Sequence, residues 1–308
     1  MKILVVTDKP FAAVAVSQIR GVVEKGGHQL TLFEKYKTPQ ELHEAVRDAD
    51  AMIVRSDIID AAVVAAAAKL KIVVRAGAGY DNLDLQACSE RNIVAMNTPG
   101  QNSNAVAELA FGMMLYLARG GFDGKTGSEL LGKSLGLHAF GNVGKCMAKI
   151  AAGMGMDVCA FDPFVDSKVI MEAGVTPVET IEDLYRKCRY VSLHLPSNDK
   201  TKKSIGENLL SLMPEGAVLV NTARKEVINE EELVKVMGNR PDLKYISDIA
   251  PDNAAVFAEK FSGRYFFTPK KMGAQTEEAN INAGAAAARQ IVDFFATGND
   301  TFRVNKNK

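Results

Sequence analysis

The sequence lacks several features typical of membrane, secreted or metal-dependent proteins. No apolar run approaches the roughly 18 residues of a membrane-spanning helix. The acidic Asp8 follows the first residue too closely for a signal peptide. The four cysteines (Cys88, Cys146, Cys159 and Cys188) form no Cys-x-x-Cys pair, and the four histidines lack the spacing of metal ligands. We therefore expect a cytoplasmic protein with reduced thiols and no metal site.

A charge imbalance is also missing. Lys+Arg and Asp+Glu each number 37, so the formal net charge is zero. Such a chain has no bulk positive charge with which to attract nucleic acid or a membrane surface. No internal repeat or low-complexity stretch is present. An anionic ligand must therefore be bound by a few cations at one place.

The 308 residues are enough for two domains, and 47% of them are hydrophobic. In the first hundred residues, short apolar runs alternate with amphipathic stretches, which is typical of buried parallel strands and covering helices. The expected strands cover residues 3–6, 30–33, 51–54, 72–74 and 93–96. The expected helices cover residues 14–25, 39–48, 61–69 and 85–91. This order predicts a small doubly wound domain of the flavodoxin type.

The middle of the chain contains the pattern of a dinucleotide-binding βαβ unit. Residues 135–144 read Leu-Gly-Leu-His-Ala-Phe-Gly-Asn-Val-Gly, and a helix is expected over residues 145–153. A second apolar run ends at Asp162, 18 positions after Gly144. Small residues let a pyrophosphate approach the helix N-terminus, and the acid accepts from a ribose hydroxyl. Ala139 replaces the first glycine of the usual fingerprint, and a βα turn without a ligand is the alternative.

Further elements extend this second domain. A long helix is expected over residues 102–119, followed by strands over 190–195, 217–221 and 245–249. The alanine-rich helix over residues 276–297 is expected to return to the first domain, because small side chains permit close helix packing. We thus predict one domain from residues 1–98 and 281–308, and an inserted nucleotide-binding domain from residues 99–280.

Five further motifs carry a family resemblance. They are Arg-Ala-Gly-Ala-Gly-Tyr-Asp-Asn (75–82), Asn-Thr-Pro-Gly-Gln-Asn-Ser (97–103), Ser-Leu-His-Leu-Pro (192–196), Met-Pro-Glu-Gly-Ala-Val-Leu-Val-Asn-Thr-Ala-Arg (213–224) and Thr-Pro-Lys-Lys-Met-Gly-Ala (268–274). With them the chain resembles the D-2-hydroxyacid dehydrogenases, and most closely the short D-3-phosphoglycerate dehydrogenases that lack a regulatory C-terminal extension.

The resemblance implies an α/β fold of two doubly wound parallel-sheet domains, a flavodoxin-like substrate domain and an inserted Rossmann NAD domain. It implies NAD-dependent oxidation of D-3-phosphoglycerate to 3-phosphohydroxypyruvate, the first step of serine biosynthesis, by a homodimer joined through the nucleotide domains. One alternative is a glyoxylate or hydroxypyruvate reductase. Another is a binding protein that senses NAD, because the family includes transcriptional co-repressors.

Three arginines follow apolar strands, and the carboxyl end of a parallel strand faces the ligand crevice. The planar fork of Arg224 suits a substrate carboxylate and the developing C2 oxygen. Arg55 and Arg75 are expected to bind the substrate phosphate, as matching positions do in the family. The alternatives are ion pairs with Glu226, Asp57 and Asp81 respectively.

Other residues are expected near the substrate carboxylate. The turn 76–79 is built from small residues, so the main-chain N–H groups of Ala76 and Gly77 can face an anion. Asn102 precedes the long helix, where its side chain can reach the carboxylate or cap the helix.

Two departures from the family pattern concern the acid–base residue. Lys271, preceded by an extra Lys270, stands where the family has its catalytic histidine. Asn253 stands in place of the partner glutamate, and the nearest acid is Asp252. A lysine base needs its pKa of about 10.4 lowered, which burial in the cleft and the charges of Lys270 and Arg224 favour. The alternative is that Lys271 is an exposed cation and that Lys270 or water takes the proton.

The cofactor assignments combine the fingerprint with the resemblance. They comprise Gly141, Asn142, Val143, Gly144, Asp162, His194, Pro196, Thr201, Asn221, Thr222, Ala223, Asp248 and Gly273. The Asp162 carboxylate repels a 2′-phosphate, which predicts NAD over NADP. His194 is expected to form part of the cofactor wall rather than act as a base, and His138 to fill a strand position.

Overall fold

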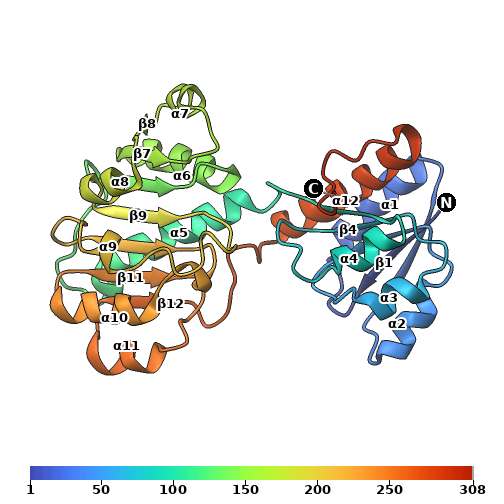
Figure 1. The fold of residues 1–308 in the computed structure, drawn as a ribbon, viewed down its shortest axis with the longest axis horizontal. Coiled ribbons are helices and arrows are strands. Elements are labelled where there is room, and N and C mark those ends of the chain that lie inside the picture. Colours follow the sequence, from blue (N-terminus) through green and yellow to red (C-terminus); the bar gives the residue numbers. More distant parts are fainter. Residues whose placement is uncertain (307–308) are drawn as a thin grey trace. The chain divides into compact units, whose positions relative to one another are not determined.

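The computed structural model describes residues 1–306, which fold as two compact units (Figure 1). Unit 1 comprises Met1–Asn102 together with the chain from Gln275 onward, and unit 2 comprises Ser103–Ala274. The chain therefore passes between the units after residues 102 and 274, whereas the sequence placed these transitions after residues 98 and 280.

Unit 1 contains a sheet of five parallel strands. These are β1 (Lys2–Thr7), β2 (Gln29–Glu34), β3 (Ala51–Val54), β4 (Ile72–Arg75) and β5 (Val94–Asn97). Their order in the sheet is β2-β1-β3-β4-β5, so the predicted flavodoxin-like arrangement is confirmed. Ile3 and Val5 belong to one apolar core cluster and Leu4 and Val6 to another, because alternate side chains of a strand point to opposite faces.

The helices of unit 1 are α1 (Ala13–Lys25), α2 (Pro39–Val46), α3 (Ala61–Ala66), α4 (Leu85–Glu90) and α12 (Glu277–Thr297). Four of these five helices begin at polar capping residues, and α1 begins after Ala12 without a side-chain cap. Thr38 accepts a hydrogen bond from Glu41 N, and Asp60 and Asp84 cap α3 and α4 in the same way. Helix α12 packs on α1, β3 and β4. Gly284 permits this approach, since a Cβ there would lie 2.8 Å from Ile19 Cδ1.

Unit 2 contains a sheet of seven parallel strands. They are β6 (Ser134–His138), β7 (Asp157–Phe161), β8 (Thr176–Pro177), β9 (Tyr190–Leu193), β10 (Val218–Asn221), β11 (Lys244–Ser247) and β12 (Tyr265–Phe267). The helices are α5 (Ser103–Ala118), α6 (Asn142–Gly153), α7 (Ser167–Glu172), α8 (Ile181–Lys187), α9 (Glu207–Leu210), α10 (Glu230–Asn239) and α11 (Ala254–Lys260), with single 3₁₀ turns η1 (Gly120–Phe122) and η2 (Lys225–Val227). The sequence predicted neither β8 nor β12.

The strand order of unit 2 locates its binding crevice. The order is β12-β11-β10-β9-β6-β7-β8, so β6 lies between β7 and β9 and the strand order reverses at β6. In doubly wound sheets, ligands bind outside the carboxyl ends of the strands at this reversal. The crevice of unit 2 is therefore formed by the residues that follow β6 and β9, and the predicted Rossmann fold is confirmed.

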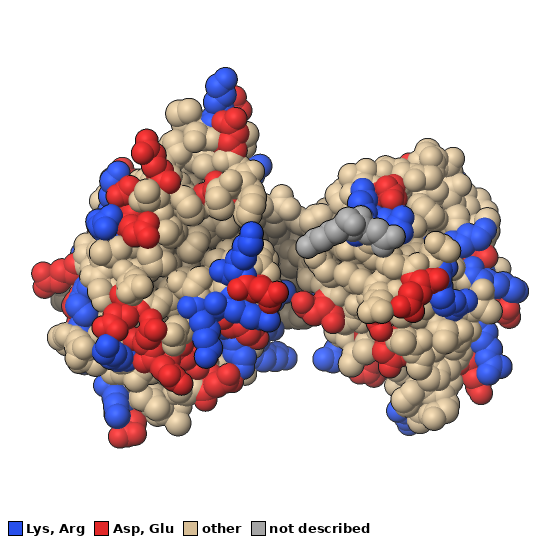
Figure 2. Space-filling model, viewed as in Figure 1, with Lys and Arg blue, Asp and Glu red and all other residues tan. Residues whose placement is uncertain are grey.

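Side chains of both charges are interspersed over the face shown in Figure 2, in keeping with the balanced composition. Among residues 1–306, no helix is both long enough and apolar enough to cross a bilayer.

Candidate active site

The turn after β6 has the geometry of a dinucleotide-binding turn. Helix α6 begins at Asn142, three residues earlier than the sequence indicated, with Gly141 at its N-cap. The N-terminal N–H groups of α6 therefore lie only a few residues after the carboxyl end of β6. A Cβ on Gly144 would lie 2.7 Å from Ala139 O, so only glycine lets the helix approach the strand this closely. The glycines at positions 141 and 144 are thus placed as the fingerprint requires.

Ala139 occupies a backbone conformation that favours glycine. Its φ is +83°, in the left-handed region, where a side chain costs about 1–3 kcal/mol. We expect Ala139→Gly to raise the stability of the protein by about 1 kcal/mol, after the extra entropy of glycine is subtracted, and its Tm by roughly 2–4 °C. Calorimetry on the variant measures this shift.

Ala152→Gly is the matched control for this prediction. Ala152 lies exposed within α6, where glycine lowers helix stability by about 1 kcal/mol. The same substitution should therefore have opposite signs at the two positions. A Tm that falls in both variants would contradict the assignment of strain to Ala139.

The Asp162 carboxylate is held against the turn. Its Oδ2 accepts from Phe140 N at 2.8 Å, and its Oδ1 accepts from Phe164 N at 2.9 Å. Each carboxylate oxygen can still accept a further bond, because it carries two lone pairs. The acid at the end of β7 is therefore fixed beside the β6–α6 turn, where a ribose hydroxyl would meet it.

Two histidines lie at the strand reversal and are neutral at physiological pH. Burial lowers the pKa of His138 to about 4 and that of His194 to about 3. His138 lies on β6, as expected, and its Nδ1 is 3.3 Å from Tyr185 Oη. His194 N donates to His138 O at 2.9 Å. A group with so low a pKa is a poor proton acceptor near pH 7, which argues against catalysis by either histidine.

Buried polar atoms without hydrogen-bond partners mark the same edge of the sheet. Among the described residues these atoms include His194 Nε2, after β9, and Thr222 Oγ1, after β10. Buried polar groups are normally satisfied, so unpartnered ones at a crevice suit a bound polar ligand. In the loop after β9, Thr201 Oγ1 donates to Pro196 O at 2.6 Å, and this bond closes the loop over residues 196–201.

The turn after β10 brings two cations together. Asn221 is buried and shapes the turn, since its Oδ1 accepts from Ala223 N and its Nδ2 donates to Arg224 O. Ala223 O accepts from Arg224 Nη1 at 3.1 Å and from Lys271 Nζ at 2.7 Å. One carbonyl oxygen thus binds both predicted catalytic side chains. Their positive charges lie close together, as the sequence analysis expected.

The loop that carries Lys271 is fixed by a buried carboxylate. Asp248 Oδ1 accepts from Thr268 Oγ1 at 3.0 Å and from Met272 N at 2.9 Å, and its Oδ2 accepts from Gly273 N at 2.7 Å. A Cβ on Gly273 would lie 2.8 Å from Asp248 Oδ2. The sequence assigned Asp248 and Gly273 to the cofactor and missed this positioning role. In the sequence, this role could have been suspected from an acid directly after an apolar strand and a later loop that contains a glycine.

Two expectations about Lys271 need correction or refinement. Its side chain is exposed in the structure, so the fold of unit 2 does not itself supply the burial expected to lower its pKa. Asp252 does not replace the missing glutamate, because its carboxylate pairs with Lys225 at 2.5 Å. The main-chain N–H groups of Asp252 and Asn253 donate to the Glu230 carboxylate. The Asp252 carboxylate thus pairs with a different lysine.

In unit 1, Arg55 is already fastened to main-chain and side-chain oxygens. Its Nη1 donates to Lys9 O and Pro10 O at 2.8 and 2.9 Å, and its Nη2 donates to Asn280 Oδ1 at 2.7 Å. The alternative ion pair with Asp57 is not formed: Asp57 Oδ1 accepts from Asp8 N and Tyr36 Oη, and its Oδ2 has no hydrogen-bond partner among the described residues. Of its five N–H groups, Arg55 has only two left for a phosphate.

Arg75 and the turn that follows it form the second predicted substrate-binding segment of unit 1. Arg75 Nε donates to Arg55 O at 3.0 Å. A Cβ on Gly77 would lie 1.3 Å from Arg75 Nη1, so the glycine leaves room for the guanidinium. Ala76 N donates to Val54 O and Gly77 N to Arg75 O. The fold itself uses these two N–H groups, and their assignment to a substrate carboxylate stays a prediction.

Asn102 is the last residue of unit 1 and directly precedes α5, the position of a helix cap. Among residues 1–306, no group of three or more His, Cys, Asp or Glu side chains could hold a metal ion.

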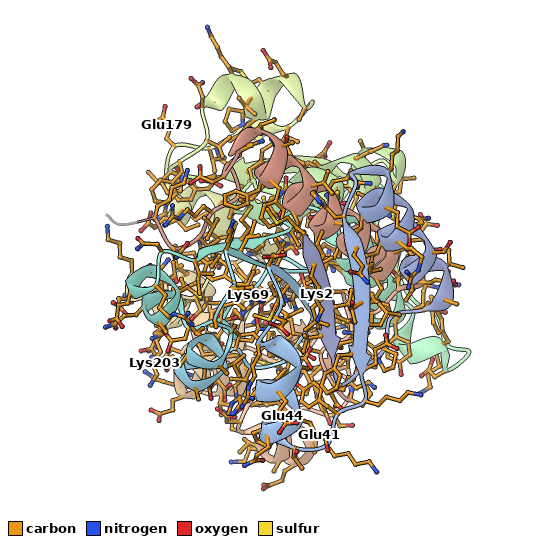
Figure 3. All side chains as sticks on the ribbon, turned by 90° about the vertical axis from the view of Figure 1, so that its right-hand side faces the viewer. Lys2, Glu41, Glu44, Lys69, Glu179 and Lys203 are labelled. Carbon is orange, nitrogen blue, oxygen red and sulfur yellow. The ribbon has the colours of Figure 1, made fainter. Side chains whose placement is uncertain are left out.

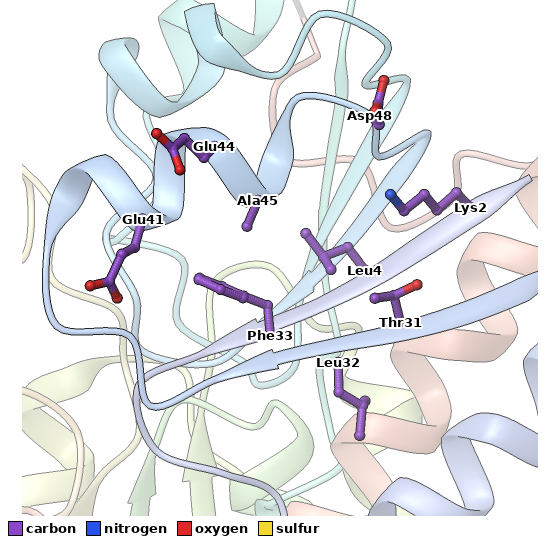
Figure 4. Close-up of a pocket in the computed structure, with 9 residues that line it drawn as sticks. All are labelled: Lys2, Leu4, Thr31, Leu32, Phe33, Glu41, Glu44, Ala45 and Asp48. Atoms are coloured by element: carbon purple, nitrogen blue, oxygen red, sulfur yellow. The ribbon is translucent and has the colours of Figure 1, made fainter.

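A pocket of about 430 Å³ lies in unit 1 between α2 and strands β1 and β2 (Figure 4). Its floor is apolar, and Glu41, Glu44 and Asp48 line it together with Lys2. Lys69 pairs with Asp48 at 2.9 Å, and Figure 3 labels this lysine with Lys2 and the two glutamates. None of the predicted site residues lines this pocket. It is thus separate from the candidate active site.

Comparison with known proteins defines the class. The family described as "D-isomer specific 2-hydroxyacid dehydrogenase, catalytic domain" matches residues 5–305. The chain belongs to this family, which confirms the resemblance found in the sequence. A solved structure of D-2-hydroxyisocaproate dehydrogenase, 21% identical with a TM-score of 0.81, shares the fold.

Particular relatives have narrower names. A solved structure of 3-phosphoglycerate dehydrogenase from Entamoeba histolytica, with bound NAD⁺, is 50% identical with a TM-score of 0.88, and the match covers 100% of this chain and 99% of that one. D-3-phosphoglycerate dehydrogenase of Methanocaldococcus jannaschii is 35% identical over 273 residues, which are 82% of this chain and 51% of that protein. Hydroxypyruvate reductase of Thermotoga maritima is 32% identical over 283 residues, 85% of this chain and 90% of that protein. The chain thus spans about half the length of the M. jannaschii relative.

Proposed function

We propose that the protein is an NAD-dependent dehydrogenase of 2-hydroxy acids. More particularly, we propose that it oxidises D-3-phosphoglycerate to 3-phosphohydroxypyruvate, the first step of serine biosynthesis. The convergence of Arg224 and Lys271 on Ala223 O carries the proposal, since it unites a carboxylate-binding fork with a proton acceptor in the dinucleotide-binding unit. The full-length similarity to the E. histolytica enzyme supports this substrate.

In the proposed reaction, the residues of unit 2 bind and deprotonate the substrate. Arg224 holds the carboxylate and stabilises charge on the C2 oxygen. Lys271, in its deprotonated form, takes the hydroxyl proton through Nζ. Bound NAD⁺ supplies the hydride acceptor. Asp248 acts on Lys271 indirectly, because its three hydrogen bonds hold the loop 268–273 in place.

The turn residues after β6 are proposed to bind the pyrophosphate, and Asp162 to bind the ribose. A carboxylate in that position repels a 2′-phosphate, and the following Pro163, Phe164 and Val165 supply no compensating cation. We expect kcat/KM with NAD to exceed that with NADP by at least about tenfold, which corresponds to roughly 1.4 kcal/mol. Steady-state assays with both cofactors measure the ratio. Equal values would refute the role of Asp162.

Arg55 and Arg75 are proposed to bind the substrate phosphate. Losing one charge-assisted hydrogen bond costs about 1.5–3 kcal/mol, so each alanine variant should raise KM for 3-phosphoglycerate roughly ten- to a hundredfold. KM for an unphosphorylated 2-hydroxy acid should change much less. Arg75→Ala is the cleaner test, because Arg55 also fastens residues 9, 10 and 280.

The matched control for the arginines is Arg20→Ala, which removes an exposed cation of unit 1 paired with Glu24. Its KM values should stay at wild type. If Arg75→Ala impairs both substrates equally, the phosphate assignment is contradicted and the reductase alternative is favoured.

A second candidate function is reduction of hydroxypyruvate or glyoxylate, which the T. maritima relative favours. Assays of the purified protein with 3-phosphoglycerate and NAD, and with each oxoacid and NADH, separate the two. Turnover of the unphosphorylated oxoacids alone would support the second candidate. Absence of turnover with any of them would support a binding protein. We also propose that the protein is cytoplasmic and forms a homodimer through unit 2, as the family resemblance suggests.

A further inference from the structure

Two cysteines far apart in the sequence meet on one face of the unit 2 sheet. Cys159 lies on β7, and Cys188 follows α8 as its C-cap residue. Both belong to the same apolar cluster. Gly136 on β6 connects their positions, because it is the register partner of Cys159. A Cβ on Gly136 would lie 3.0 Å from Cys188 Cβ and 3.1 Å from its Sγ. The Cys188 side chain thus covers the glycine beside Cys159.

This arrangement suits a disulfide. Neighbouring strands are about 4.8 Å apart, and a disulfide needs Cβ atoms about 3.5–4.5 Å apart. The missing side chain at Gly136 lets Cys188 enter the space next to β7. The Cys188 thiol lies near enough to Cys159 to lower the pKa of the Cys159 thiol. The two cysteines therefore flank the same glycine, Cys159 from the neighbouring strand and Cys188 from the end of α8.

The two thiols differ in reactivity. Cys159 is partly exposed, and the adjacent Cys188 thiol, together with the charge of Lys187, lowers its pKa to about 7 despite burial and the opposing charge of Asp157. Cys188 is fully buried, and its pKa is raised by the adjacent Cys159 thiol and by burial. Burial also raises the pKa of Cys88 and Cys146. Cys159 is therefore the thiol that most readily provides a thiolate near pH 7.

We propose that Cys159 and Cys188 form a peroxide-responsive dithiol site, with Cys159 as the attacking thiol and Cys188 as the resolving one. The Cys159 thiolate attacks the O–O bond of hydrogen peroxide, which gives a sulfenic acid and, after protonation, one water. The Cys188 thiol then attacks that sulfur and loses its proton, and the hydroxyl leaves as a second water. Two thiols are oxidised by two electrons, and one peroxide is reduced to two waters.

The disulfide would close the segment that contains α7, β8 and α8. This segment begins three residues before Asp162 and includes Tyr185, whose hydroxyl lies by His138. Oxidation would therefore restrain the edge of the sheet next to the dinucleotide turn. Trapping by Cys188 would also protect Cys159 from irreversible oxidation to the sulfinic acid.

The test treats the full-length protein with hydrogen peroxide and follows it by intact mass and non-reducing peptide mapping. We expect the mass to fall by about 2 Da, with residues 159 and 188 in one linked peptide pair. Free thiols measured under denaturing conditions should fall from four to two. The rate should increase as the pH rises through about 7, where Cys159 ionises.

Variants distinguish the roles of the two thiols. Cys188→Ala should form no disulfide and should accumulate the Cys159 sulfenic acid, trapped with a dimedone probe, and then a gain of about 32 Da. Cys159→Ser should leave Cys188 unmodified, and it serves if Cys188→Ala does not fold. Cys146→Ala is the matched control and should behave as wild type. Four thiols remaining in the treated wild type, a different linked pair, or equal Cys159 sulfinic acid in wild type and Cys188→Ala would overturn the proposal.

Discussion

Replacing Lys271 by alanine should lower kcat for 3-phosphoglycerate oxidation by about 10²–10⁴-fold, the range for loss of a positioned general base. The affinity for NAD should stay close to wild type, because the fingerprint turn and Asp162 lie on other parts of unit 2. Stopped-flow or steady-state rates measure the first effect, and fluorescence titration with NADH measures the second. A large loss of kcat is expected because Lys271 Nζ is held 2.7 Å from Ala223 O, beside the Arg224 guanidinium that is proposed to bind the substrate.

Lys270→Ala is the control, because Lys270 is the adjacent lysine and its side chain is also exposed. It should keep most of the wild-type rate. The wild-type rate should rise toward alkaline pH, since an ordinary lysine has a pKa of about 10.4 and acts as a base only when deprotonated. Near-wild-type turnover in Lys271→Ala, or equal losses in both variants, would remove Lys271 from the mechanism.

Replacing Arg224 by glutamine should lower kcat/KM by about 10²–10³-fold, the usual cost of removing one donor to a developing oxyanion. Glutamine keeps hydrogen-bonding capacity but loses the charge and the planar fork. Arg224→Lys restores the charge without the fork and should recover only part of the loss. Kinetics on the three proteins, with thermal melts to show that each is folded, provide the measurement.

Lys225→Ala is the matched control for Arg224, because it removes the neighbouring cation. The Lys225 ammonium pairs with Asp252 rather than with the Ala223 carbonyl. Its kinetic constants should therefore remain near wild type. If Lys225→Ala loses as much activity as Arg224→Gln, the effect is one of general positive charge and not of a specific fork.

Much of the fold could be predicted from hydrophobic patterning. Four of the five strands of unit 1 are short apolar runs buried on both faces, and such runs stand out between polar turns. Strands β8 and β12 were missed for physical reasons. Strand β8 has only two residues, one of them a proline, and β12 is an aromatic run of three. Runs this short contain no detectable period, so pairing with a neighbouring strand decides their conformation.

The candidate site could be predicted at those positions where the residue type itself indicates the chemistry. A glycine fingerprint and strand-end arginines indicate their chemistry directly. Hydrogen bonds between distant segments were not predictable. Asp248 fixes a loop more than twenty residues later, and Ala76 and Gly77 use their N–H groups within the fold. The sequence also does not reveal how far the side chains around a loop cover Lys271, which is exposed in the structure.

The two bonds that the Asp162 carboxylate accepts bear on attempts to redesign cofactor choice. Exchanging this acid for an arginine or serine is the obvious way to admit NADP. In this protein the exchange would also leave the amides of Phe140 and Phe164 without their acceptor; water can replace it at the exposed Phe164 amide, but the partly buried Phe140 amide would lose about 1–3 kcal/mol. An engineered NADP enzyme on this scaffold therefore needs a new acceptor for Phe140 N in the same step, and libraries that vary position 162 alone should yield unstable proteins rather than switched ones.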